Sequence, residues 1–375
     1  MADSSRSIYF NPQAANERCQ LLEVDGLQAF HQSMPNSAPT PLVSLPTVAA
    51  QVGVNSVFVK DESNRFGLPA FKILGASWGV FRAVTTHLKL PSATSLDTLI
   101  QHTHVQTHPI VLFTATDGNH GRAVAFMARM LGLPAHIFLP EAVGDLVREK
   151  IRSEGAYVHP VSGNYDQAVQ MAADTANATE GGLLVQDMAF AGYEAVPTWI
   201  VEGYSTMLNE IETQLAELGT KVNLLLTPVG VGSLAQAVVC FGKSYDRNIT
   251  IVTVEPDTAA CLQASLMKGG PVSIDTSSTI MEGMNCGTVS LASWNYLHRL
   301  VDVSLTVSCH ESHQAVQDLA SWSVDSGPCG AASLAALRRL SQSEQGRLLL
   351  PKDAVVVLLS TEGSRPYEIP TQSPI

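Results

Sequence analysis

The stretch that decides the fold is VLFTATDGNHGRAVAFMARMLG, residues 111–132, because it contains a complete strand, turn and helix. Its first six residues are apolar or β-branched, a pattern that favours a short buried strand. In its second half, apolar side chains recur at the i, i+3, i+4 and i+7 spacing of one helical face, at Val124, Met127, Ala128 and Leu131. Gly132 then follows as a typical helix stop. We therefore predict a strand that leads through a polar turn into a helix.

The same strand–helix unit is repeated downstream. The expected elements are strands in AHIFLP (135–140), YVHPV (157–161) and GLLVQD (182–187), with helices over 141–155 and 164–178 between them. Consecutive strand–helix units pack as a parallel sheet with right-handed crossovers. We therefore expect residues 76–195 to form a small α/β domain.

A second α/β unit follows the first. Its expected elements are a long helix over 196–218, a strand, glycine turn and helix in VNLLLTPVGVGSLAQAVVCF (222–241), and strands in ITIVTVEP (249–256) and AVVVLLSTEG (354–363). Because SVFVKDES (56–63) also has the pattern of a strand, residues 1–75 are expected to join residues 196–375 in a large domain. The predicted fold class is α/β, with two three-layer parallel-sheet domains and a ligand in the crevice between them.

The amino-acid composition argues against several classes of function and partner. The 375 residues are 45% hydrophobic and 15% charged, which indicates a globular chain, and the net charge of −12 argues against nucleic acid or an anionic membrane as partner. No apolar run is long enough to span a membrane, and the N-terminus has no signal-peptide pattern. Six cysteines lie far apart without a CxxC pair, which favours reduced thiols and a cytoplasmic location.

Three histidines in the polar region 85–110 could be taken for a metal cluster. His102, His104 and His108 lie in what we expect to be a loop after a helix end. Acidic and cysteine ligands do not accompany them closely in sequence, so we expect a solvated loop and no metal site.

TPVGVGSLAQ (227–236) is a candidate anion-binding turn. A strand ends there, Gly230 and Gly232 permit a tight turn, and a helix begins near Ser233. Unpaired N–H groups at a helix start favour an anion. The stretch lacks the third glycine of a dinucleotide fingerprint and the GK[ST] of a P-loop, so a single phosphate is favoured over a dinucleotide. A plain strand-to-helix turn explains these glycines equally well.

TATDGNHGRA (114–123) is a second polar turn of the same kind. It gathers Thr116, Asp117, Gly118, Asn119 and His120 between a strand and a helix. Backbone N–H groups in such a turn can hold a carboxylate, an asparagine can donate to an oxygen, and an aspartate can act as base or acid. A simple Asn or Asp helix cap accounts for one such residue, but it does not require the whole set.

Lys72 lies in ESNRFGLPAFKILGAS (62–77), between Phe71 and Ile73. Partial burial lowers the pKa of a lysine, and a neutral amine attacks an aldehyde to form a Schiff base. A lone lysine at a helix start is more commonly a snorkelling surface residue. In combination with a phosphate turn and a polar turn, however, Lys72 points to pyridoxal 5'-phosphate (PLP) as cofactor.

Several ordered segments together resemble a known family. The chain is similar to the fold-type II PLP-dependent enzymes, which share the fold of tryptophan synthase β and threonine dehydratase, and within them to the diaminopropionate ammonia-lyase branch. The similar segments are KDESNRFGLPAFKILGAS (60–77), TATDGNHGRAVAF (114–126), VQDMAFAGYEAVPTWIVEGY (185–204), GVGSLAQAV (230–238), VEPDTAAC (254–261), TIMEGMNCG (279–287) and LSTEG (359–363).

The resemblance implies roles for individual residues. Lys72, beside Phe71, would hold PLP as a Schiff base, and Asn119 would bond the phenolic oxygen of the cofactor. Thr361 or Ser360 would face the pyridine nitrogen, and a neutral partner there favours elimination over transamination. The phosphate would be held by the backbone of Gly230, Val231, Gly232, Ser233 and Leu234.

The resemblance also implies a reaction. The turn with Thr116, Gly118 and His120 would hold the substrate carboxylate. Lys72 would remove the Cα proton of an L-substrate and Asp117 that of a D-substrate. Asp187 would position the β-ammonium group, which leaves as ammonia. The aminoacrylate product then hydrolyses to pyruvate and a second ammonia. A homodimer is what this family suggests.

One departure leaves alternatives open. In the family, the motif before the last helix contains an acidic residue, whereas this chain has Pro328 and Cys329 in SGPCG (326–330). The exact substrate is therefore open. Serine or threonine dehydration and β-replacement are the alternative reactions, and a ligand-binding protein that retains the fold is the alternative without catalysis.

Overall fold

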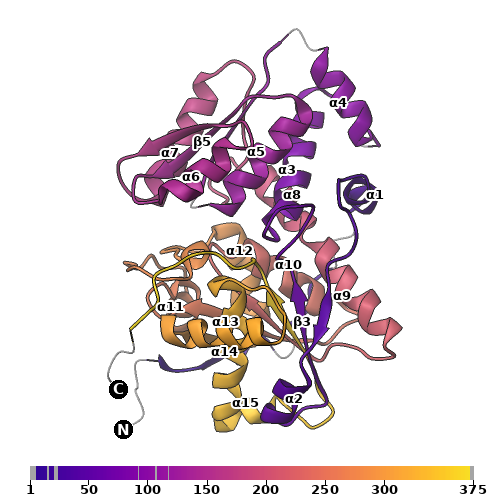
Figure 1. Cartoon of the computed structure of the whole chain (residues 1–375), viewed down its shortest axis with the longest axis vertical. Helices are drawn as coiled ribbons and strands as arrows, with labels where there is room; N and C mark the ends of the chain where they lie inside the picture. Colours follow the sequence, from indigo (N-terminus) through magenta and orange to yellow (C-terminus); the bar gives the residue numbers. More distant parts are fainter. Residues whose placement is uncertain are drawn as a thin grey trace.

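The computed structural model describes residues 6–14, 17–20, 24–91, 93–105, 108–116 and 118–371. The chain forms two bodies, each built on its own sheet (Figure 1). The upper body in Figure 1 carries the helices of residues 96–178, and the lower body carries those of residues 261–348. Two helices, α3 (Lys72–His87) and α8 (Ala195–Gly203), lie where the two bodies meet.

The upper sheet is four-stranded and parallel throughout. Its order is β6 (Tyr157–Val161), β5 (Ala135–Pro140), β4 (Val111–Ala115) and β7 (Gly182–Leu184). The connecting helices are α5 (Asn119–Leu131), α6 (Asp145–Arg152) and α7 (Tyr165–Ala178). The predicted strand–helix repeats and their parallel pairing are therefore confirmed.

The lower sheet is seven-stranded, with a parallel centre and antiparallel edges. Its order is β1 (Tyr9–Phe10), β10 (Val303–Val307), β9 (Thr250–Pro256), β8 (Leu224–Pro228), β11 (Val355–Ser360), β3 (Ser56–Asp61) and β2 (Leu42–Ser44). The central strands are buried on both faces, as the continuous Val- and Leu-rich run of β11 requires. Because β3 pairs with β11, the strand before Lys72 lies beside the C-terminal strand.

The remaining helices cover these sheets. They are α1 (Leu27–Gln32), α2 (Pro46–Val52), α3 (Lys72–His87), α4 (Leu96–His104), α8 (Ala195–Gly203), α9 (Ser205–Glu217), α10 (Ser233–Gly242), α11 (Cys261–Lys268), α12 (Leu291–Leu300), α13 (Cys309–Ser321), α14 (Pro328–Gln342) and α15 (Glu344–Leu348), with a short 3₁₀ helix at Glu282–Met284. Among the described residues, no helix combines the length and apolar character needed to cross a membrane.

Two local expectations were wrong. Part of the expected loop at 85–110 is helix α4, whose start is capped by the Ser95 hydroxyl accepting the Thr98 N–H at 3.2 Å. The expected single helix over 196–218 is two helices, α8 and α9, which meet at Tyr204. Ser95 is a typical N-cap residue that could have indicated α4. The apolar face of 196–218 continues past Tyr204 and gives no sign of the break there.

Close packing of α3 against α8 fixes the helix that begins with Lys72. A Cβ atom added at Gly75 would lie 2.7 Å from the Ile200 carbonyl oxygen, and one added at Gly203 would lie 2.4 Å from the Leu74 carbonyl oxygen. Such distances are shorter than side-chain contacts allow, so both positions need glycine. The two backbones therefore approach closely at the junction of the two bodies.

Candidate active site

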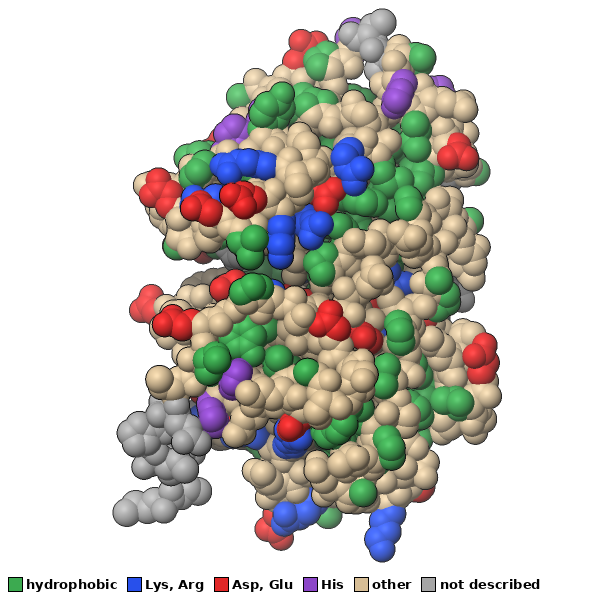
Figure 2. All heavy atoms as spheres, in the orientation of Figure 1, with side chains coloured by type: hydrophobic (Ala, Val, Ile, Leu, Met, Phe, Trp, Pro, Cys, Tyr) green, Lys and Arg blue, Asp and Glu red, His purple; other side chains and the backbone are tan. Residues whose placement is uncertain are grey.

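One cavity, with a volume of about 180 Å³, opens between the two bodies at the carboxyl ends of strands from both sheets. Figure 2 shows the molecule hollowed between its upper and lower halves. Strands β4 and β7 contribute from above, and β8 and β11 contribute from below. The lining includes Phe71, Lys72, Thr116, Gly118, Asn119, His120, Asp187, Gly230, Val231, Gly232, Ser233, Leu234 and Thr361.

These are the site residues predicted from the sequence, and together they form part of the lining of this cavity. Asp117 lies outside the described residues. Ser360, the alternative to Thr361, does not line the cavity, because its hydroxyl bonds the Ser326 hydroxyl at 2.8 Å. His102, His104 and His108 are remote from it, and the described residues contain no group of three or more His, Cys, Asp or Glu able to hold a metal ion.

Lys72 is the first residue of α3, and its Nζ donates to Asp187 Oδ2 at 2.5 Å. Burial acts to lower the pKa of Lys72, but attraction to the Asp187 carboxylate outweighs it, so this pKa lies above its ordinary value. The expected lowering of the lysine pKa was therefore wrong. Apolar neighbours alone would lower the pKa, and the carboxylate reverses their effect.

Asp187 is held ionised by the same pair. Burial alone would raise the pKa of Asp187, but the charge of Lys72 brings it down to about 2. The Tyr165 hydroxyl also approaches Asp187 Oδ1 at 3.4 Å. The cavity therefore contains a partly buried cation and a buried anion in contact, at the carboxyl end of the upper sheet.

His120 is buried beside this pair. Its Nε2 lies 2.9 Å from the Val185 carbonyl oxygen, and because a carbonyl can only accept, Nε2 carries the hydrogen. Burial lowers the pKa of His120, so the imidazole is neutral at physiological pH. His120 therefore contributes no charge to the cavity.

The glycine turn after β8 forms an anion cradle. Gly232 has φ +102°, a conformation that favours glycine, and α10 begins at the next residue. The first-turn N–H groups of α10 have no partner within the helix, and no side chain caps them. A Cβ atom at Gly230 would lie 3.0 Å from the Gly283 carbonyl oxygen, so a larger residue would crowd the cavity rim.

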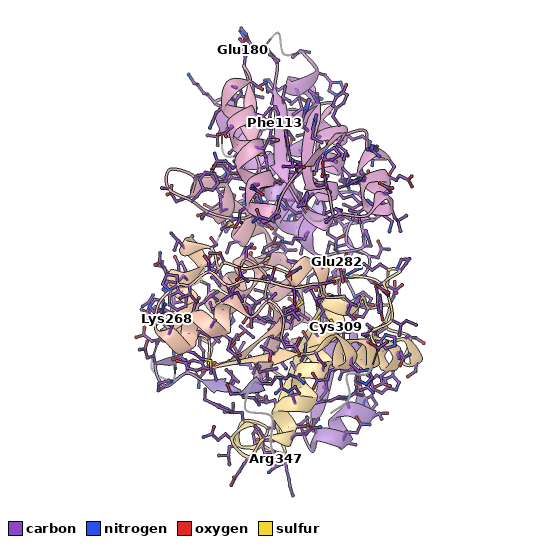
Figure 3. The ribbon with its side chains drawn as sticks, turned by 90° about the vertical axis from the view of Figure 1, so that its left-hand side faces the viewer. Phe113, Glu180, Lys268, Glu282, Cys309 and Arg347 are labelled. Carbon is purple, nitrogen blue, oxygen red and sulfur yellow. The ribbon has the colours of Figure 1, made fainter. Side chains whose placement is uncertain are left out.

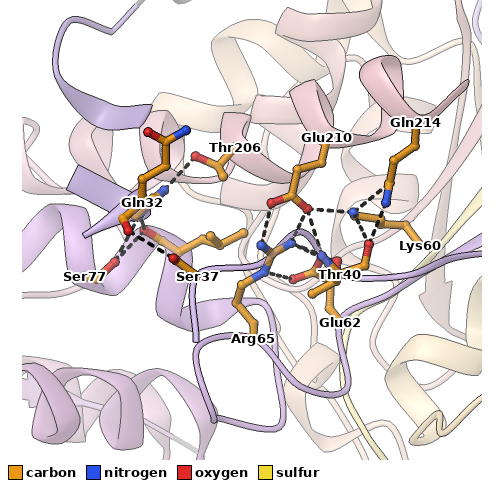
Figure 4. Close-up of polar contacts among 12 residues, drawn as sticks. Gln32, Ser37, Thr40, Lys60, Glu62, Arg65, Ser77, Thr206, Glu210 and Gln214 are labelled. Atoms are coloured by element: carbon orange, nitrogen blue, oxygen red, sulfur yellow. Dashed lines mark hydrogen bonds and ion pairs between the residues drawn. The ribbon is translucent and has the colours of Figure 1, made fainter. Parts of the chain in front are cut away.

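The segment before Lys72 is locked by a buried ionic network (Figure 4). Arg65, only 1% exposed, bonds Glu62 and both carboxylate oxygens of Glu210 at 2.6–2.8 Å. Lys60 pairs with the same Glu210 at 2.7 Å. These contacts tie the residues between β3 and α3 to α9, and so fix the approach of the chain to Lys72.

Several other lining residues were not predicted from the sequence, and three of them are charged residues joined by contacts. Glu362 follows β11, Arg365 lies three residues later, and Glu282 pairs with Arg365 at 3.2 Å. Figure 3 shows Glu282 on the lower body, at the side toward the upper body. Glu362 stands at the carboxyl end of a buried parallel strand, which is where ligands bind in α/β folds. The position of Glu362 at the end of this strand in LSTEG was the available signal in the sequence.

A lysine at a helix start and an anion cradle that line one cavity between two α/β bodies are typical of the class of fold-type II PLP enzymes. The described residues fit that cofactor: an amine for its aldehyde, uncapped N–H groups for its phosphate, and an amide at Asn119 for its phenolic oxygen. The comparisons agree, because the model of the family "Pyridoxal-phosphate dependent enzyme" matches residues 34–361. The chain belongs to this family.

Within this family, the chain is similar to diaminopropionate ammonia-lyases in both sequence and structure. The chain is 37% identical over 361 residues to diaminopropionate ammonia-lyase of Salmonella typhimurium, covering 91% of this chain and 89% of that protein. It superposes on the Escherichia coli diaminopropionate ammonia-lyase crystallised with D-serine, with a TM-score of 0.87 and 31% identity over 96% of this chain and 94% of that one. The same E. coli enzyme with an aminoacrylate–PLP azomethine intermediate gives a TM-score of 0.84, with the same identity and coverage.

Proposed function

We propose that this protein is a PLP-dependent ammonia-lyase that eliminates the β-amino group of 2,3-diaminopropionate. The products are pyruvate and two molecules of ammonia, the second released when the enamine product hydrolyses. The observation that carries the proposal is the Lys72–Asp187 pair in a cavity with an anion cradle. Similarity to diaminopropionate ammonia-lyases over most of the chain supports it.

Cofactor binding is assigned to residues from both bodies. Lys72 would bond the aldehyde carbon, and the N–H groups of Gly230–Leu234 would hold the phosphate. Asn119 would donate to the phenolic oxygen, Thr361 would face the pyridine nitrogen, and Phe71 would lie beside the lysine. When bound, PLP supplies an electron sink for the bond that breaks at Cα.

Proton movement is assigned to Lys72 and Asp187. A neutral Lys72 amine would take the Cα proton of an L-substrate. Asp187, which is held ionised, would bind the β-ammonium group in place of the Lys72 ammonium. A β-amine leaves only when it is protonated, so a carboxylate at that position keeps the leaving group charged until the bond breaks. Asp117 remains our proposal for the base acting on a D-substrate.

Substrate orientation is assigned to the turn before α5. The Thr116 hydroxyl accepts the N–H groups of Gly118 and Gly121, at 2.9 and 3.1 Å, and so shapes this turn. The turn lines the cavity at Thr116, Gly118 and His120, where backbone N–H groups would bind the substrate carboxylate. Because the His120 ring is neutral, it would not attract the substrate carboxylate away from these N–H groups by charge.

The decisive experiment is a product assay with the purified, PLP-loaded protein. Pyruvate and ammonia are measured with L- and D-2,3-diaminopropionate, L-serine and L-threonine, using Lys72→Ala as the inactive control. We expect turnover of diaminopropionate to exceed that of the hydroxy amino acids. A protein that stays colourless with added PLP would refute the enzyme assignment. Preference for serine or threonine would establish the alternative, which is kept because Cys329 lines the cavity in a motif where the resemblance implies an acidic residue.

We also propose the domain boundaries, the cellular location and the oligomeric state of the protein. We propose that residues 1–75 and 196–375 form the PLP-binding domain and that 76–195 form the smaller one, in agreement with the two separate sheets. We also propose a cytoplasmic homodimer. The cysteines at 19, 240, 261, 286, 309 and 329, all present as free thiols, support a reducing compartment.

A further inference from the structure

A buried carboxylate, Glu362, lines the same cavity as the Lys72–Asp187 pair and has no role in the mechanism above. Its side chain is nearly enclosed, with 5% of the residue exposed. Its backbone pairs with Ala70, two residues before Lys72, so it is rigidly tied to the lysine segment. A Cβ atom at Gly327 would lie 2.8 Å from Glu362 Oε1, so the space for this carboxylate depends on a glycine.

Each oxygen of Glu362 has a defined partner. Oε2 accepts from Asn119 Nδ2 at 3.2 Å, across the boundary between the two bodies. Oε1 accepts the Cys329 N–H at 3.1 Å and lies 3.6 Å from Arg365 Nε. Arg365 in turn pairs with Glu282 at 3.2 Å on the cavity rim, where Figure 3 shows Glu282 at the edge facing the other body. The carboxylate therefore connects a rim arginine to the amide of Asn119.

We propose that Glu362 is a positioning residue that fixes the orientation of the Asn119 amide for the cofactor. This inference rests on the proposed function, because it places PLP beside Asn119. An asparagine amide can turn over, since its oxygen and nitrogen are similar in shape. A carboxylate can only accept, so Glu362 holds the nitrogen end and leaves the second N–H of that nitrogen for the phenolic oxygen.

The neighbours of Glu362 separate this role from a structural one. Glutamine at position 362 can keep its oxygen on the Cys329 N–H, which preserves the contact that holds the 327–330 segment. Its amide nitrogen would then face the Asn119 nitrogen, donor against donor. Asn119 relieves this conflict by turning over, which presents its oxygen to the glutamine and alters the groups available to the cofactor. The substitution thus disturbs the positioning contact while keeping the structural one.

The test is a double-mutant cycle on PLP affinity. Dissociation constants of PLP are measured for the wild type, Glu362→Gln, Asn119→Ala and the double variant, together with the absorbance spectrum of the bound cofactor. We expect Glu362→Gln to weaken PLP binding about tenfold, the scale of one hydrogen bond to an anionic oxygen, and to shift the spectrum. In the Asn119→Ala background the same substitution should have no further effect.

A matched control replaces another buried carboxylate at a strand end. Glu255 on β9 accepts the backbone N–H groups of Leu262 and Gln263, at 2.7 and 2.8 Å, and does not line the cavity. Glu255→Gln should leave PLP affinity unchanged. If Glu362→Gln does not fold, Arg365→Met is measured in the same cycle and should lose its effect in the Asn119→Ala background.

Two results would overturn the inference. One is wild-type PLP affinity and spectrum in Glu362→Gln. The other is an equal weakening with and without Asn119, which would show that Glu362 acts through the Cys329 segment instead. Failure of the proposed function is distinguishable from both, because the wild type itself would then fail to bind PLP or to release pyruvate.

Discussion

Lys72 Nζ and Asp187 Oδ2 lie 2.5 Å apart, although 115 residues separate them in the chain. The pair raises the pKa of the lysine and lowers that of the aspartate to about 2, so both groups are charged across the physiological range before the cofactor binds. The amine must lose its proton before it can attack an aldehyde. Asp187 therefore slows the reaction of Lys72 with the cofactor aldehyde, because it keeps the amine protonated. In the proposed reaction, the same carboxylate binds the β-ammonium leaving group.

Asp187→Asn should therefore separate these two effects. Removing the carboxylate lowers the pKa of Lys72, because the opposing charge is gone while burial remains. PLP incorporation at pH 7 should become faster, while kcat for diaminopropionate should fall by about 100-fold or more. Incorporation is followed by absorbance and turnover by pyruvate release, with the exposed Asp353→Asn as control. Unchanged turnover would contradict the assigned role.

These observations also show which features a sequence can predict. The strand, turn and helix at 111–132 are encoded locally, and so is the cradle at Gly230 and Gly232, because spacing and glycine position determine them. The shift in the pKa of Lys72 was predicted in the wrong direction, because Asp187 causes it and is far from Lys72 in the sequence. Only the folded chain brings the two residues together. Glu362 was missed for the same reason, since its partners Asn119 and Cys329 come from distant segments.

The Arg65 network makes a prediction about stability. Arg65→Met leaves Glu62 and Glu210 without their principal cation in a buried site, and Lys60 compensates for only part of that charge. We expect the free energy of unfolding to fall by about 3–5 kcal/mol, the usual result of breaking a buried ion pair on one side. Chemical denaturation measures it.

A surface pair provides the control for Arg65. Arg338 lies 2.7 Å from Asp318 with both side chains partly exposed, so Arg338→Met should cost less than about 1 kcal/mol. Equal losses in the two variants would show that burial of the Arg65 network adds nothing to stability.

His31 makes stability depend on pH. Burial, with repulsion from Arg65, lowers the pKa of His31 to about 3, from an ordinary value of 6.5. Between pH 6.5 and pH 3, His31 therefore binds a proton in the unfolded chain but not in the folded chain. The contribution is fully present above pH 6.5 and is lost as the pH falls toward 3, at about 1.4 kcal/mol per pH unit.

His31→Gln should remove this part of the acid sensitivity. The variant loses the contacts of His31 with Thr206 and the Leu74 carbonyl, so it will be less stable at pH 7. Its free energy of unfolding should nevertheless fall less steeply than that of the wild type between pH 6 and pH 4. Denaturant titrations at several pH values give both slopes, and parallel slopes would rule out His31 as the source.

Gly232 links backbone conformation to cofactor binding. Its φ of +102° disfavours any side chain, and an added Cβ would lie 3.1 Å from both Ser293 and Leu297 of α12. Gly232→Ala must therefore shift the turn that presents the first N–H groups of α10. We expect PLP affinity to fall more than tenfold, because the phosphate contacts depend on where these groups point.

Gly269 provides the matched control for this substitution. It has a similar left-handed φ of +74° at the end of α11, but an added Cβ would meet nothing within 4 Å. Gly269→Ala should cost about 1 kcal/mol of stability through backbone strain alone and leave PLP affinity unchanged. Measured side by side, the two alanine variants separate strain, which they share, from displacement of the cradle, which only Gly232→Ala causes. Equal PLP affinity in both would show that the turn at Gly232 does not hold the phosphate.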